Sequence, residues 1–254
     1  MRLYLSSVLE SEISLEKKKE FCKGLYVLFS FAYNNKSDCK TLIPYCKDVL
    51  MDSGAFTIMN KSKKDFDIMD YCKRYANFIK ENNIEKFIEL DIEGVFGFDK
   101  YKDCLHCLQD ITGKNPIYVF HKWRGIDYYK ELVRKYDYVA LGDVSVGSGS
   151  RKLYQYFPWF LNEAHKNNCK VHGLAFTSMK DLQFMDFDSV DSSSWTMGAR
   201  YARMFRFDGH SVRTYDCRRT EERELPSSTE CKEYCLPEWK KLSEYFDKEY
   251  EPIW

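Results

Sequence analysis

Short apolar segments alternate with longer amphipathic segments along most of this 254-residue chain. The apolar runs have the length of strands, and the segments between them carry apolar residues at helical spacing. The predicted strands span residues 2–6, 25–31, 48–52, 86–91, 116–121, 138–142, 170–175 and 188–191. The predicted helices between them span residues 65–83, 99–113, 127–136, 152–168 and 178–185.

This alternation predicts an α/β fold with a mostly parallel sheet, because parallel strands need long crossover connections. Eight such strands in about 250 residues favour a closed (β/α)8 TIM barrel. An open doubly wound sheet is the alternative. However, no G-x-G-x-x-G follows the first strand and no G-x-x-x-x-G-K-[ST] occurs in the sequence, so the usual nucleotide-binding loops of open sheets are missing.

The sequence after Ser192 exceeds what a barrel needs. It contains a possible strand at residues 211–216 and a last helix at residues 228–250, with a proline near its middle. We predict that residues 1–195 form the barrel core. Residues 196–254 are expected to form a C-terminal helical appendage that closes the barrel, is rich in arginine at its start and is not an independent domain.

The composition, with 44% hydrophobic residues, is typical of a folded globular protein. No run of about 18 apolar residues occurs, so we expect no contact with a membrane. The first residues, MRLYLSSVLESEIS, make a poor signal peptide because serine and glutamate interrupt the apolar stretch. We therefore expect a soluble, cytoplasmic protein.

Ten cysteines are scattered through the chain, which favours reduced, half-buried thiols over a disulfide framework. Cys104 with Cys107 and Cys231 with Cys235 are the two pairs closest to metal-ligand spacing. Neither has a second pair at zinc-finger spacing, and both lie in helical patterns. We expect no cofactor; zinc is possible but is not supported by this spacing.

The formal net charge is zero, so any electrostatic attraction to nucleic acid must be local. One short stretch holds more arginines than the rest of the chain, namely Arg200, Arg203, Arg206, Arg213, Arg218, Arg219 and Arg223. Guanidinium groups match phosphate oxygens, so this stretch is a candidate phosphate-binding surface. The alternative is a solvated face that nearby glutamates neutralise.

Ionisable residues stand at the ends of five predicted strands, where a barrel gathers its active site. They are Asp52, Asp91, His121, Asp143 and Asp191. A single aspartate in this position is usually a helix N-cap. A ring of acids facing one cavity raises pKa values and lowers stability, which favours a functional role for the set.

Two chemistries use such a ring: metal binding, and glycosyl transfer in which one carboxylate attacks the anomeric carbon while another manages protons. The first strand is not followed by H-x-H, the usual sign of a barrel metallohydrolase, and His121 and His172 are far apart in sequence. The pattern favours carboxylate chemistry without a metal.

Four segments resemble the tRNA-guanine transglycosylases, also called queuine tRNA-ribosyltransferases. MDSGAF is similar to their D-S-G-G-F element, and ELDIEG to the next strand end, which supplies a base-reading aspartate. ALGDVSVGS is similar to their G-G-L-A-V-G-E loop, and HGLAFTSMKDLQFMDFDSVDSSSW to the run that leads to the nucleophilic aspartate. The four segments keep the family's order over roughly residues 47–195.

The resemblance implies an enzyme, a pentosyltransferase that exchanges guanine in nucleic acid for a 7-deazaguanine through a covalent aspartyl intermediate. It implies that Asp191 is the nucleophile and Asp52 the general acid/base. Asp91 would bind the Watson–Crick edge of the base, with the backbone of Gly142 and Asp143 on another edge. The other substrate-binding residues of this reading are Ser53, Gly54, Phe56, His121, Gly173 and Leu174. Phe56, Phe120 and Phe176 are candidates to stack on the base.

The chain departs from the family pattern at three single residues and in one longer element. His121 in FHKWRG stands where the family has a glutamine, Asp143 replaces the second glycine of a pair, and Ser148 stands where a glutamate tunes the choice of base. The family's C-x-C-x-x-C zinc element, which helps to hold tRNA, is not recognisable here.

A compact, zinc-free chain is similar to the transglycosylase-like proteins of phages and bacteria that insert 7-deazaguanines into DNA. The expected substrates are therefore DNA, or less favoured tRNA, and a 7-deazaguanine base. A partner protein or a homodimer is possible, and a phage-encoded protein would act in the host cytoplasm. The nucleic-acid contacts are assigned to Arg200, Arg203, Arg206, Arg218 and Arg219. The alternatives are a metal-dependent barrel hydrolase and a non-catalytic nucleic-acid-binding subunit of a transglycosylase complex.

Overall fold

The computed structural model describes residues 1–33, 36–61, 66–142, 154–176, 178–182, 184–200, 203–216 and 226–249. Eight parallel strands form one curled sheet in the order β4-β3-β2-β1-β8-β7-β6-β5. The strands are β1 (Arg2–Leu5), β2 (Tyr26–Ser30), β3 (Asp48–Asp52), β4 (Lys86–Phe87), β5 (Tyr118–Phe120), β6 (Tyr138–Leu141), β7 (Lys170–Gly173) and β8 (Ser189–Ser192). Each predicted strand is present, in most cases one to four residues shorter than predicted.

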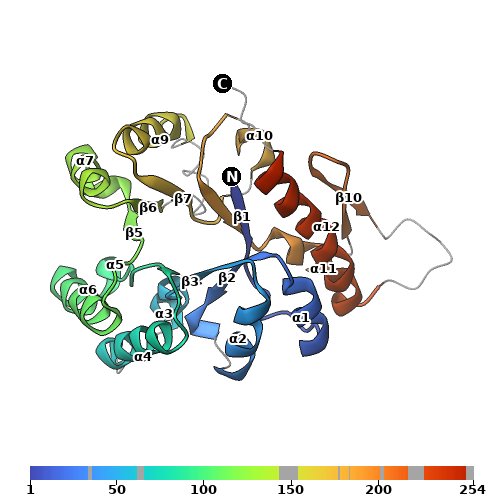
Figure 1. The fold of residues 1–254 in the computed structure, drawn as a ribbon, viewed down its shortest axis with the longest axis horizontal. Coiled ribbons are helices and arrows are strands. Elements are labelled where there is room, and N and C mark those ends of the chain that lie inside the picture. Colours follow the sequence, from blue (N-terminus) through green and yellow to red (C-terminus); the bar gives the residue numbers. More distant parts are fainter. Residues whose placement is uncertain are drawn as a thin grey trace.

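Helices follow the strands and surround the sheet in Figure 1. They are α1 (Leu15–Cys22), α2 (Lys36–Leu42), α3 (Ala55–Lys61), α4 (Ile68–Glu81), α5 (Glu93–Phe96), α6 (Phe98–Thr112), α7 (Ile126–Lys135), α9 (Phe157–Lys166), α10 (Met179–Leu182), α11 (Met197–Arg200) and α12 (Ser228–Lys248). Short 3-10 helices occupy Phe31–Tyr33, Ile43–Tyr45, Lys122–Arg124 and Ser194–Thr196. The helix patterns of the sequence correspond to α4, α6, α7, α9, α10 and α12.

The sheet is not closed by a regular ladder, since β4 and β5 are its two edge strands. Ile88 and Ile117 form a single parallel bridge between them. Beyond this bridge the carboxylate of Glu89 accepts a hydrogen bond from the backbone N–H of Val119 at 2.8 Å, which places a side chain where a strand carbonyl would stand. The structure thus confirms an α/β chain with a curled, TIM-barrel-like sheet of eight parallel strands, whose ladder is incomplete at β4 and β5.

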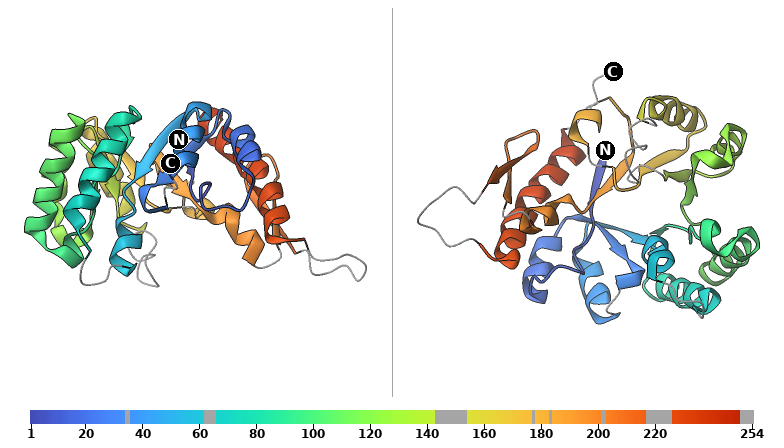
Figure 2. Two further views of the ribbon diagram at one scale, coloured as in Figure 1. Left: turned by 90° about the horizontal axis from the view of Figure 1, so that it is seen from below. Right: turned by 180° about the vertical axis from the view of Figure 1, so that it is seen from behind.

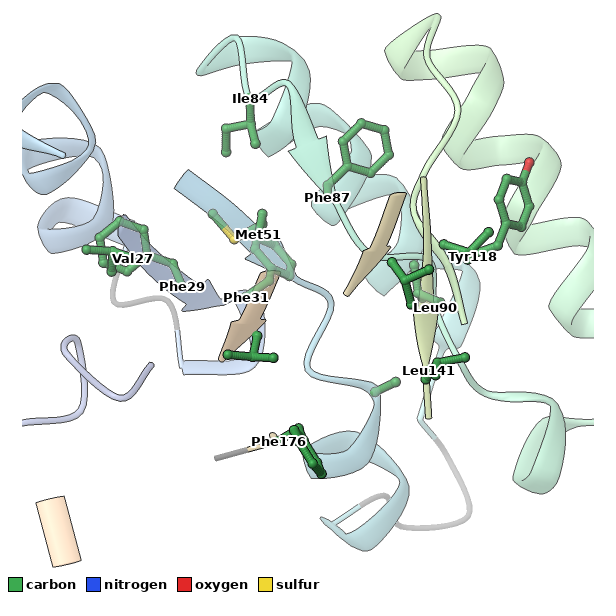
Figure 3. Close-up of a cluster of buried hydrophobic side chains, with 14 of the residues drawn as sticks. Val27, Phe29, Phe31, Met51, Ile84, Phe87, Leu90, Tyr118, Leu141 and Phe176 are labelled. Atoms are coloured by element: carbon green, nitrogen blue, oxygen red, sulfur yellow. The ribbon is translucent and has the colours of Figure 1, made fainter. Parts of the chain in front are cut away.

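Both faces of the strands are buried, as expected for a parallel sheet covered by helices. One set of side chains fills the inside of the curled sheet: Tyr4, Tyr26, Leu28, Leu50, Ile88, Ile117, Val119 and Ala140. The alternate positions face the helices and belong to a larger cluster, part of which is shown in Figure 3. Because of this alternation, every second side chain near the carboxyl ends of the strands points into the space that the curled sheet encloses.

The C-terminal helix α12 belongs to the helix layer that covers the sheet. Leu236, Trp239, Leu242 and Phe246 are buried in the same cluster as β1. The hydroxyl of Ser243 donates to the carbonyl of Leu3 at 2.8 Å. The segment predicted as an appendage therefore contributes to the core beside the first strand, and Figure 2 shows α12 lying along the outside of the strands.

An antiparallel hairpin of β9 (Arg203–Phe207) and β10 (Val212–Asp216) precedes α12. The sequence predicted the second of these strands and missed the first. The ring of Phe205 meets Trp239 edge to face at 5.7 Å, and the N–H of Phe207 donates to Glu238 at 2.8 Å. The hairpin thus lies on the outer side of α12, away from the sheet (Figures 1 and 2).

Candidate active site

A cavity of about 520 Å³ opens at the carboxyl ends of the strands. Four of the five predicted strand-end groups line it, namely Asp52, Asp91, His121 and Asp191. The fifth, Asp143, lies outside the described residues, as does Ser148. Ser53, Gly54, Phe56, Gly142 and Leu174 also line the cavity, as the sequence predicted. Side chains from five strand ends, far apart in sequence, therefore share one space.

Asp52 is the last residue of β3 and is only partly exposed. Burial, reinforced by the nearby charge of Asp191, raises its pKa to about 6. Hydrogen bonds from Ser30 and from the N–H of Gly54, the latter at 3.0 Å, oppose this rise. A carboxyl group with a pKa near the working pH can both donate and accept a proton, which suits a general acid/base.

Asp191 lies in β8 and is 7% exposed. Its Oδ1 accepts a hydrogen bond from the N–H of Ala175 at 2.6 Å and lies 3.4 Å from Nε2 of the fully buried His172. Among the described residues no hydrogen bond reaches Oδ2. One carboxylate oxygen is thus held by the protein, and the other has no such contact in the described part of the chain.

The backbone that holds Asp191 is itself unusual. Ala175 has φ of +52°, a left-handed conformation that non-glycine residues seldom adopt. This conformation directs its N–H to the carboxylate. A strained backbone that positions an acid is typical of a functional site.

Asp91 and His121 form a hydrogen-bonded pair with 2.6 Å between Oδ2 and Nε2. The His121 ring stacks on Trp123, with an interplanar angle of 15°. Gly142 is required beside this pair, because a Cβ on it would lie 2.6 Å from Cε1 of His121. Both residues of the pair line the cavity.

Gly54 lines the cavity and also has a packing role that the sequence did not predict. A Cβ on Gly54 would lie 2.3 Å from the Cβ of Ala32, so the glycine lets two chain segments pack closely. Its φ of +73° is a second reason for glycine.

Three residues assigned to the base lie elsewhere. Gly173 is absent from the cavity lining, and a Cβ on it would face the rings of Phe176 and Phe187. Phe120 and Phe176 are 3% and 1% exposed and pack among other aromatic rings in the core. The alternation of the strands turns these side chains outward. Of the three candidate stacking rings only Phe56 remains at the cavity, where it is 69% exposed.

The sequence analysis missed Glu89, a buried acid that also lines the cavity. Tyr101 donates to its Oε2 at 2.7 Å and the N–H of Val119 to its Oε1 at 2.8 Å. Burial raises the pKa of Glu89 to about 7, although these hydrogen bonds oppose the rise. Only the groups at the predicted strand ends were candidates, and Glu89 stands two residues before Asp91, inside the predicted strand.

The described arginines of the predicted phosphate surface do not line the cavity. Arg203 and Arg206 are exposed on β9, and Arg213 stands opposite Arg206 in the hairpin and pairs with Asp208 at 2.5 Å. Arg200 ends α11. Arg218, Arg219 and Arg223 lie outside the described residues.

Within the described parts of the chain, no three Cys, His, Asp or Glu side chains are grouped as metal ligands. Cys104 is buried and Cys107 half-buried in α6, while Cys231 and Cys235 are buried in α12. No described helix is both long enough and apolar enough to cross a membrane.

Comparison with protein-family models finds no match, and comparison with curated proteins finds no significant one.

Proposed function

We propose that this chain is a pentosyltransferase that exchanges guanine in DNA for a 7-deazaguanine base through a covalent aspartyl–sugar intermediate. The observation that carries the proposal is that Asp52 and Asp191 line one cavity, close enough for the charge of Asp191 to raise the pKa of Asp52. A nucleophile and an acid/base with separate environments are what a double-displacement glycosyl transfer needs.

In the first half-reaction, Oδ2 of Asp191 attacks C1′ of the target nucleotide and the C1′–N9 bond breaks. The bonding electrons leave with guanine, and Asp52 in its protonated form supplies the proton that N9 takes up. A pKa of about 6 keeps a share of Asp52 protonated near neutral pH.

In the second half-reaction, the incoming 7-deazaguanine gives its N9 proton to ionised Asp52. Its N9 then forms the new bond to C1′, and the ester bond to Asp191 breaks as the carboxylate regains its electron pair. Each exchange restores both carboxyl groups and needs no external oxidant or reductant. A nucleobase must leave its stack to reach the mouth of such a barrel.

The Asp91–His121 pair supports the recognition of a purine edge. A carboxylate is a good bidentate acceptor for the N1–H and N2–H2 donors of guanine, and the imidazole adds a neighbouring polar atom. Gly142, Ser53 and Leu174 form the adjoining walls. We assign the phosphate contacts to the arginine-rich stretch around β9, outside the cavity.

The test is incorporation of a labelled 7-deazaguanine into single-stranded DNA, duplex DNA or tRNA. We expect label in DNA with the wild type, and a loss of at least about 1,000-fold in Asp191→Asn and in Asp52→Asn. Asp127→Asn is the matched control, because Asp127 is an exposed carboxylate on α7 outside the cavity lining.

A protein–DNA adduct that survives denaturation and disappears in Asp191→Ala is the positive sign of the covalent step. Label in neither polymer, or full activity in Asp191→Asn, would contradict the proposal. Label in tRNA alone would keep the reaction and change the substrate. Stoichiometric divalent metal in active protein would favour the metal-dependent hydrolase instead.

A further inference from the structure

His172 is a buried polar residue that the proposed reaction does not yet use. Its side chain is completely buried within β7, below the cavity, and the ring of Tyr4 meets it edge on at 6.1 Å. Among the described residues its Nε2 has no hydrogen-bond partner, and it faces Oδ1 of Asp191 at 3.4 Å. A buried ring nitrogen without a partner is costly unless it serves another group.

The other ring nitrogen of His172 begins a chain of hydrogen bonds. Nδ1 lies 2.6 Å from Oγ of Ser189, and the same Oγ lies 2.5 Å from the hydroxyl of Tyr138. Ser189 is fully buried. Since a serine hydroxyl has one proton, it can donate to only one of these two neighbours.

One of the two directions satisfies every group. If Ser189 donates to His172, then Tyr138 donates to Ser189 and the ring proton of a neutral His172 sits on Nε2, aimed at Asp191. In the reverse direction the hydroxyl proton of Tyr138 has no acceptor among the described residues. A neutral His172 would then turn the lone pair of Nε2 toward a carboxylate oxygen, which is unfavourable.

We infer that His172 is a positioning residue whose Nε2–H, oriented by Ser189 and Tyr138, stabilises the carboxylate of Asp191 as it leaves C1′ in the second half-reaction. This inference rests on the proposed function. The ester intermediate leaves Oδ1 as a neutral carbonyl oxygen, and breaking the C1′–Oδ2 bond returns the electron pair to the carboxylate. The contact between Nε2 and Oδ1 shortens and strengthens as that charge develops, because hydrogen bonds to charged groups are the strong ones.

The kinetic test separates the two half-reactions in single turnover. His172→Leu is expected to slow release of the adduct by about 10- to 100-fold and to lower kcat with little change in the KM for the incoming base. His172→Gln is expected to recover most of the rate, because its amide N–H can occupy the place of Nε2–H. His165→Gln is the matched control, since His165 pairs with Asp188 at 3.0 Å outside the cavity.

Nitrogen-15 NMR of the ring in the wild type gives a readout that does not depend on activity or on a variant that folds. We expect the proton on Nε2 and a bare Nδ1. A proton on Nδ1 with a bare Nε2, adduct release at the wild-type rate in His172→Leu, or a glutamine variant no better than leucine would each overturn the inference. If the wild type incorporates no base and forms no adduct, the proposed function fails, and the NMR result alone then decides the orientation of His172.

Discussion

Replacement of Asp52 by asparagine is expected to make the protein more stable at neutral pH while it abolishes base exchange. The pKa of Asp52 is raised from 3.8 to about 6, chiefly by burial. The folded state binds the proton of the Asp52 carboxyl more tightly than the unfolded state does. The contribution of this proton to the free energy of unfolding is therefore complete below about pH 4 and is lost as pH rises through about 6. The rise in the pKa of Asp52 from 3.8 to about 6 corresponds to a loss of roughly 3 kcal/mol in the free energy of unfolding once the carboxyl is ionised above pH 6.

Asparagine keeps the shape of the side chain and can still accept the N–H of Gly54, so it removes the charge without opening a cavity. Urea unfolding at pH 7.5 should therefore give Asp52→Asn a free energy of unfolding higher by about 1–3 kcal/mol. The advantage should shrink at pH 5, where the wild-type carboxyl is mostly protonated.

Asp91→Asn is the contrasting variant in the same cavity. Asp91 has a partner, His121, at 2.6 Å; an amide oxygen is a poorer acceptor than a carboxylate, so asparagine weakens this hydrogen bond and should lower the free energy of unfolding at pH 7.5. An Asp52→Asn protein that is less stable than the wild type at pH 7.5, or whose difference does not change with pH, would refute the assignment of a desolvated carboxylate.

Two further predictions concern glycines. Gly54→Ala should lower the free energy of unfolding by about 2–5 kcal/mol, because φ is +73° and the new Cβ would lie 2.3 Å from that of Ala32. Gly24 has a similar φ of +71°, but a Cβ on it would have nothing within 4 Å. Gly24→Ala should therefore lower the free energy of unfolding by only about 1–2 kcal/mol in the same urea titration. Equal losses in the two variants would argue against the close contact between Gly54 and Ala32. Gly142→Ala should displace the ring of His121, because the new Cβ would lie 2.6 Å from its Cε1, and should raise the KM for the incoming base by about 10-fold or more; an unchanged KM would remove His121 from base recognition.

The sequence predicted the strands and the long helices because their signals are local. Apolar runs bounded by turn residues need no knowledge of distant partners, and the eight strands were found within a few residues. Short helices such as α3, α5 and α11 have too few residues for a helical period to be read. The short β4 and its single bridge to β5 could not be predicted either, because Glu89 completes that junction with its side chain.

The sequence by itself determined the order of strands and helices, because their signals are local, and it predicted Asp52, Asp91, His121 and Asp191 at strand ends, although β4 ends at Phe87, four residues before Asp91. Only the tertiary structure decided that these four side chains meet in one cavity, since their proximity depends on how the sheet curls. It also decided that Gly54 packs against Ala32 and that His172 faces Asp191. These contacts join residues that are distant along the chain, and local patterns carry no information about them.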